Sequence, residues 1–198
     1  MTNETNPQEL SDRLKIIEDM LLEGRRTTER WGWTFLLWGV ALYIATFWSL
    51  VTNPMIAWAV TVTVASVATW FGGWWINRDK PQTAKSRAIG AVWSSVGIAT
   101  FLFAFCGPLS GHAEVHLSVA GIEILQGVAN AASSMMLRWK AQFMVALTWW
   151  TAGVATLFMN EKDLGIIFLA ATFVCNIAFG IYLMLHESAE RKRELAHA

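Results

Sequence analysis

Charged residues are scarce in this chain. Only 15% of its 198 residues are Asp, Glu, Lys or Arg, whereas roughly a quarter is usual in soluble domains. Apolar residues make up 55% of the sequence, and tryptophan alone occurs 12 times. This balance excludes an ordinary soluble domain. The formal net charge is zero, and we expect no nucleic-acid partner.

Cysteine is almost absent, and the common catalytic motifs are missing. Cys106 and Cys175 are expected at depths that differ by about 15 Å along a helix, which is too far for a disulfide. Neither has the spacing of a metal-ligand pair. The sequence contains no P-loop, nucleophile elbow, zincin helix or Rossmann glycine pattern. We therefore predict that the protein is not an enzyme and has no cofactor or metal.

Long apolar runs dominate the rest of the sequence, each close to the roughly 20 residues that a helix needs to cross a bilayer. They predict an all-α, polytopic membrane bundle of six transmembrane helices within residues 31–186, in contact with the lipid bilayer. The expected spans are residues 31–51, 55–77, 88–106, 115–137, 141–159 and 164–186.

The distribution of Lys and Arg predicts the orientation. If six helices alternate in direction, every one of the 15 Lys and Arg residues except Lys162 falls on the same side. The positive-inside rule then places both termini in the cytoplasm, including a basic tail at residues 187–198. The first thirty residues show no cleavable signal peptide. We expect a multi-pass protein of the cytoplasmic membrane.

Residues 1–30 are expected to form a separate cytoplasmic amphipathic helix. Leu10, Leu14, Ile17 and Leu21 repeat at steps of four, three and four residues, which is the spacing of a narrow coiled-coil seam. The polar face around it is mainly acidic, unlike that of a helix that binds anionic lipid. This pattern favours packing against protein, either a second copy of the chain or the loops between spans.

Glu123 is the one formal charge set deep within a predicted span. A carboxylate at that depth costs several kcal/mol unless it is protonated, paired or hydrated, so its presence indicates a role. Steps of three, four and seven residues, which stay on one helix face, connect it to other polar residues. The resulting stripe contains His116, Glu123, Gln126, Asn130 and Ser133.

Three interpretations of this stripe are open. It lines a path or cavity in which Glu123 binds or relays a cation or proton; it fixes helix register through interhelical hydrogen bonds; or it is an interface to a partner membrane subunit. Asn176, at mid-depth in residues 164–186, is expected to face Glu123 or Gln126 across the bundle, or to bond a nearby backbone carbonyl.

A metal site at the outer end of the same span is a weaker hypothesis. His112 and His116 are four residues apart, the spacing of zinc-binding helices. No third ligand is obvious nearby, so a polar helix start is the preferred interpretation. The tryptophans fit an interfacial belt and helix packing rather than a cofactor site.

The sequence therefore predicts a small integral membrane protein that handles a cation, proton or small solute through the polar stripe. A channel of this size would require a homo-oligomer. The alternative is a non-transporting membrane sensor or accessory subunit that signals through the N-terminal helix.

Overall fold

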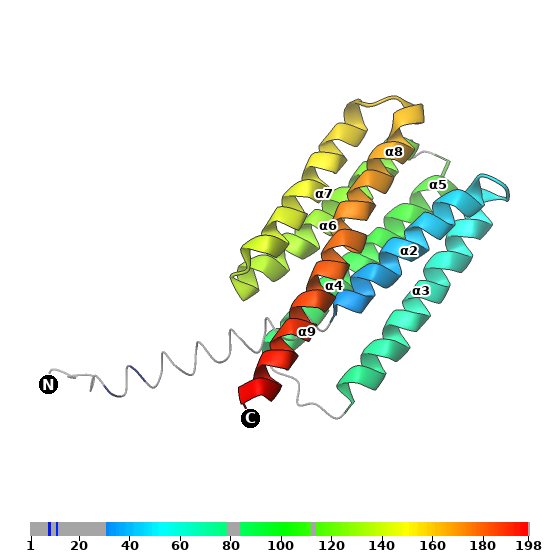
Figure 1. Ribbon diagram of the computed structural model, residues 1–198. Coiled ribbons are helices and arrows are strands. Elements are labelled where there is room, and N and C mark those ends of the chain that lie inside the picture. The colour runs from blue at the N-terminus through cyan, green and yellow to red at the C-terminus, as the bar shows by residue number, and fades with distance from the viewer. Residues whose placement is uncertain (1–7, 9–10, 12–30, 79–83, 112–113, 198) are drawn as a thin grey trace, which may run out of the picture.

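The computed structural model describes residues 8, 11, 31–78, 84–111 and 114–197, and in these residues it contains helices and no strand. The all-α prediction is confirmed. The helix predicted within residues 1–30 and the side chain of His112 lie outside the described residues. The helices run up and down side by side (Figure 1). They are α2 (Gly32–Ser49), α3 (Pro54–Asn77), α4 (Ala84–Phe101), α6 (Val115–Leu137), α7 (Lys140–Phe158), α8 (Glu161–Thr172) and α9 (Phe179–His197). The π-helical turn η1 (Leu102–Cys106) and the short α5 (Gly107–Leu109) continue α4, and the π-helical segment η2 (Phe173–Ala178) joins α8 to α9 in one continuous C-terminal helix.

Helix α3 begins where local chemistry favours a helix start. The Asn53 side chain accepts a hydrogen bond from the Met55 backbone N–H over 2.9 Å, which satisfies one of the unpaired donors of the first turn. Pro54 follows as the first helical residue, where its missing N–H costs nothing. The chain therefore reverses from α2 into α3 within a few residues.

The turn between α6 and α7 is tighter still. Arg138 ends α6 in the left-handed conformation, with φ 51° and ψ 41°, which costs a non-glycine residue roughly 1–2 kcal/mol. The Trp139 N–H then donates to the Ser134 carbonyl over 2.9 Å. Because Lys140 already begins α7, the two helices form a closely paired antiparallel hairpin.

The core lies where α7 meets the C-terminal helix formed by α8, η2 and α9. Trp149, Cys175, Phe179 and Leu183 are buried there, and the Phe35 ring of α2 meets that of Phe179 edge-on at 5.3 Å. Helices α2 and α9 also pack against each other, α3 packs against α2, and α4 packs against α6. Helices α6 and α7 and the C-terminal helix therefore surround the core of the bundle, while α3 and α4 lie at its sides.

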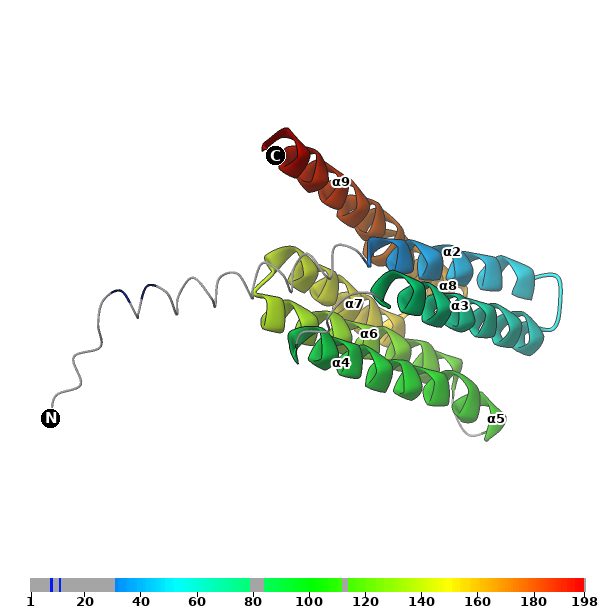
Figure 2. The same ribbon diagram turned by 90° about the horizontal axis from the view of Figure 1, so that it is seen from below.

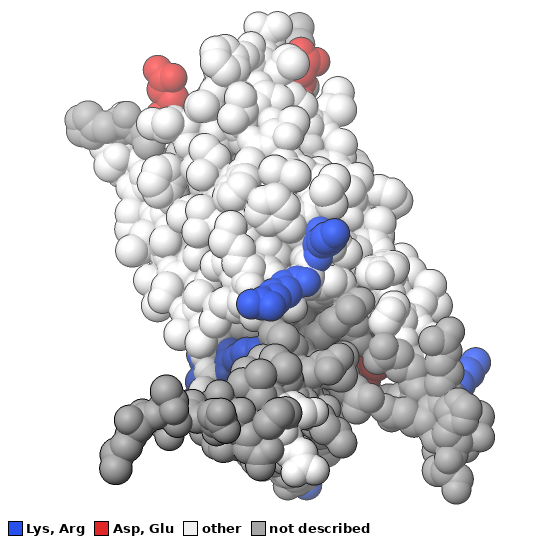
Figure 3. Space-filling model, turned by 90° about the vertical axis from the view of Figure 1, so that its left-hand side faces the viewer, with Lys and Arg blue, Asp and Glu red and all other residues white. Residues whose placement is uncertain are grey.

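The sides of the bundle are apolar. Large side chains such as Trp70 and Phe158 are 69% and 83% exposed, and the white lateral surface of Figure 3 shows few charges. Five of the described helices are long and apolar enough to cross a membrane. The chain is therefore a multi-pass membrane protein. Helix α6 is not among the five although it has 23 residues, because Glu123, Gln126 and Asn130 lower its hydropathy.

The two ends of the bundle differ in charge. We call the end with Glu114 and Asp163, where α6 and α8 begin, the acidic end; the basic end has Arg138 and Lys140 in the turn from α6 to α7. Helix α9 continues to His197, past the expected end of the last span at residue 186. Seen from below, α9 leans away from the other helices (Figure 2).

Candidate functional site

The Glu123 side chain lies between α6 and α7, nearer the open end of their hairpin than the turn at Arg138. It is completely buried, with an exposed fraction of 0%. Thr156 of α7 donates a hydrogen bond from Oγ1 to Glu123 Oε2 over 2.7 Å. Gly153 permits this approach, because a Cβ there would lie 2.9 Å from Ile124 Cγ1 and 3.4 Å from Glu123 Cβ. The missing side chain at residue 153 therefore brings the two helices into hydrogen-bonding range.

The second carboxyl oxygen, Glu123 Oε1, is enclosed and has no hydrogen-bond partner within the described part of the chain. The same holds for Asn130 Oδ1, Thr172 Oγ1 and both amide atoms of Gln142, on α6, α8 and α7 respectively. Buried polar groups without a partner cost about 1–3 kcal/mol each. Native proteins contain few such groups, so these unpartnered groups on three adjoining helices mark the interior of the bundle as the candidate site.

The stripe expected on α6 turns out to face two directions. Asn130 is seven residues from Glu123, which keeps it within about 20° of the same face, and it is 1% exposed. Ser133 turns further round the helix and accepts a hydrogen bond from Trp93 Nε1 of α4 over 3.0 Å. Gln126 and His116 are only half-buried. The structure therefore brings Glu123 and Asn130 onto one face, while Ser133 belongs to the contact with α4.

Asn176 lies in η2 and is 8% exposed. It packs beside α2, since a Cβ at Gly39 would be 3.1 Å from Asn176 Cβ. No hydrogen bond joins it to Glu123 or Gln126 in the described residues. Its neighbour Cys175 is completely buried, and its thiol donates to the Val145 carbonyl over 3.7 Å.

Two buried residues were missed from the sequence, Thr156 and Gln142. Threonine hydroxyls commonly donate to a carbonyl of their own helix, as those of Thr148 and Thr151 do. Gln142 stands two residues after Lys140 and resembles part of a polar helix start. A signal was nevertheless present: Gln142, Trp149 and Thr156 are seven residues apart, and all three are at most 1% exposed.

Metal ligands do not cluster. The described residues hold no group of three or more His, Cys, Asp or Glu side chains that could bind a metal ion. His116 lies half-buried near the acidic end. Cys106 is an exposed free thiol and Cys175 a buried one.

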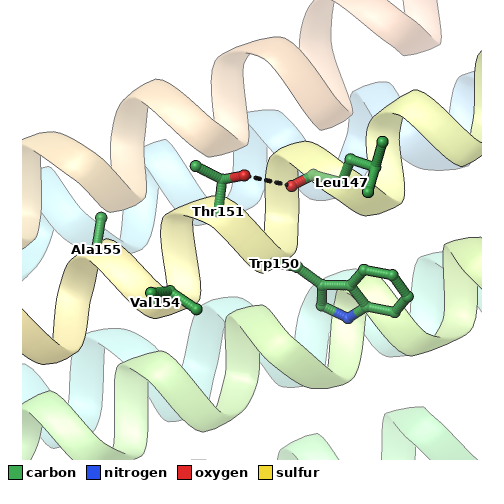
Figure 4. A pocket seen from close by; sticks show the side chains of 5 residues that line it. All are labelled: Leu147, Trp150, Thr151, Val154 and Ala155. Carbon is green, nitrogen blue, oxygen red and sulfur yellow. Dashed lines mark hydrogen bonds between the residues drawn. The ribbon is translucent and has the colours of Figure 1, made fainter.

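The hollow drawn in Figure 4 lies on the outward face of α7 and offers no reactive group. Its lining includes Thr151, whose hydroxyl donates to the Leu147 carbonyl over 2.8 Å. Trp150 also borders it, and its Nε1 donates to the Ile124 carbonyl over 3.3 Å. The remaining lining side chains are Leu147, Val154 and Ala155. Because its polar side chains already bond backbone carbonyls, we assign no function to this hollow.

Comparisons with models of protein families, with curated proteins and with solved structures found no match to this chain. Function is therefore inferred from the buried side chains described above.

Proposed function

We propose that the protein binds and transfers protons across the membrane through Glu123. The observation that carries this proposal is a completely buried carboxyl with one oxygen bonded to Thr156 and the other without a partner. The described residues place no Lys or Arg beside it, and an isolated buried carboxylate is strongly disfavoured. Glu123 therefore rests as the neutral acid. Because Oε2 accepts from Thr156, the acid proton belongs on Oε1.

The packing favours a proton over the other cargoes that the stripe suggests. Gly127 lies directly against the Trp150 ring, and Gly153 lies against Ile124, so α6 and α7 leave no room between them for a hydrated ion. A proton adds no volume to the site.

The proposed setting is the cytoplasmic membrane, with six spans and both termini inside. Support comes from the basic end, which carries Arg138 and Lys140, and from the positive-inside rule. Helix α6 completes the six as the span whose polar groups are buried by the other helices.

Proton flux in proteoliposomes tests the proposal. An imposed potassium diffusion potential would drive protons inward, and a trapped pH-sensitive dye would report them. We expect Glu123→Gln, which keeps the shape but removes the exchangeable acid, to reduce flux to that of protein-free liposomes. Glu114→Gln is the matched control, because Glu114 is exposed at the start of the same helix, and it should conduct like the wild type. Wild-type flux in Glu123→Gln, with Glu114→Gln unchanged, would refute the proposal.

A non-transporting accessory or sensor protein is the second candidate. The observation that favours it is the same close packing, which suits a rigid structural centre. In that case the wild type would show no flux above empty liposomes, and Glu123→Gln would alter only stability.

A further inference from the structure

Among the buried side chains with unpartnered polar atoms, four lie on three helices that contact one another: Glu123 and Asn130 on α6, Gln142 on α7 and Thr172 on α8. Thr34, Thr100 and Ser118 also carry such atoms, on α2, on α4 and five residues before Glu123 on α6. The four side chains have exposed fractions of 0–1%. Each of them offers at least one hydrogen-bonding atom that the described residues leave unused.

The four side chains on α6, α7 and α8 follow one another along the bundle axis, from Glu123 towards the basic end. Asn130 lies seven residues beyond Glu123 on α6, about 10 Å nearer the basic end. Gln142 lies 14 residues from Thr156 on α7, about 21 Å away and also towards the basic end. Thr172 is three residues from Cys175, whose thiol contacts the Val145 carbonyl of α7, so it falls between these levels. The row therefore starts at Glu123 and ends at Gln142.

We propose that these side chains bind a file of internal water molecules that connects Glu123 to the basic end. Buried water typically makes about three hydrogen bonds to otherwise unsatisfied polar groups, and these atoms supply both donors and acceptors. Gln142 is the one of these four side chains that lies nearest the basic end, and it positions the last water. The inference rests on the proposed function, for which the file is the proton path: a proton leaving Glu123 Oε1 joins the first water, and each water passes one of its own protons onward.

Cys175 is a native reporter for this water. Its thiol is completely buried and lies one turn from Thr172, so its hydrogen exchanges for deuterium only if water reaches the interior. Cys106, the other thiol, is exposed and is removed by Cys106→Ser. Infrared spectroscopy then follows the S–H stretch of Cys175 alone after transfer of the lipid-embedded protein to heavy water.

We expect Cys175 to exchange within minutes in the Cys106→Ser parent, and Gln142→Leu to slow that exchange by about tenfold or more, the effect of losing one buried hydrogen bond to water. Gln126→Leu is the matched control, because Gln126 is only half-buried and is not one of the four side chains proposed to bind the water, and it should exchange like the parent. Thr172→Val carries the test if Gln142→Leu fails to fold. A thiol that stays unexchanged for hours in the parent, or equal rates in Gln142→Leu and Gln126→Leu, would overturn the inference.

The two proposals fail separately. If Glu123→Gln conducts protons while exchange still depends on Gln142, only the function assigned to Glu123 is wrong. If flux requires Glu123 but exchange ignores Gln142, only the water file is wrong.

Discussion

A double-mutant cycle on Glu123 and Thr156 measures the central hydrogen bond and reports the protonation state of the carboxyl. The single variants are Glu123→Leu and Thr156→Val, each close in shape to the native side chain. Thr156→Val alone leaves Glu123 Oε2 buried without its donor, whereas the double variant leaves no unsatisfied group of this pair. Replacing both partners by apolar groups is often nearly neutral, so the double variant should be more stable than the sum of the two losses predicts.

The expected coupling follows from the state of the acid. Hydrogen bonds between helices in membranes contribute about 0.6 kcal/mol on average and about 1.7 at most, whereas bonds to charged groups contribute about 1.5–3 kcal/mol. Since we place a neutral carboxyl at residue 123, we expect about 1 kcal/mol. Unfolding by dodecyl sulfate in mixed micelles, followed by the fluorescence of the 12 tryptophans, would give the four free energies of unfolding.

Thr148→Val provides the matched control. Thr148 lies on the same helix, but its hydroxyl donates to the Met144 carbonyl over 3.0 Å, so its coupling to Glu123→Leu should be near zero. A coupling for Thr156 below about 0.3 kcal/mol, the scatter of independent sites, would refute the bond. A coupling above about 2 kcal/mol would indicate a charged acceptor and refute the neutral carboxyl.

Two further predictions concern packing. Gly127→Ala should destabilise the protein by about 1–3 kcal/mol, because the added methyl group overpacks against Trp150. Gly97→Ala is the control: no atom lies within 4 Å of the added Cβ, so it should be neutral or stabilising by up to about 1 kcal/mol. Equal effects of the two variants in the same unfolding assay would contradict the close α6–α7 contact. Trp93→Phe should remove the hydrogen bond to Ser133 and lower the free energy of unfolding by about 0.5–1.5 kcal/mol. Proton flux should stay at the wild-type level, because that hydrogen bond joins α6 to α4. Lost flux in a folded variant would place Ser133 on the proton path.

Helix positions are the part of this structure that the sequence predicts best. Helix α6 has the expected bounds, Val115–Leu137, because its apolar run lies between two charged residues, Glu114 and Arg138. The stripe on it was predicted less well. Stepping by three or four residues keeps neighbours on one face, but the 3.6-residue period accumulates an error over several steps. Ser133, ten residues after Glu123, therefore reaches α4 rather than α7.

The partner of Glu123 could not be identified from the sequence. Thr148, Thr151 and Thr156 are the same residue type on one helix, and the first two donate to backbone carbonyls of that helix. Thr156 differs through its surroundings, because Gly153 one turn earlier lets α6 approach. Which hydroxyl meets the acid thus depends on the relative register of two helices, which no local pattern specifies.

The close packing of α6 against α7 also limits what the protein can carry. A cation such as Ca²⁺ takes six to eight oxygen ligands, whereas Glu123 has a single hydrogen-bonding side chain beside it, Thr156. Trp149 lies between Thr156 and Gln142 on the same face of α7 and is 1% exposed, so a bulky solute could pass along this face only if the helices separated. The contacts of Gly127 and Gly153 with their neighbours oppose that separation. Proton transfer along ordered water needs no such opening, and it requires the one feature that close packing alone does not explain, a buried acid with a free oxygen.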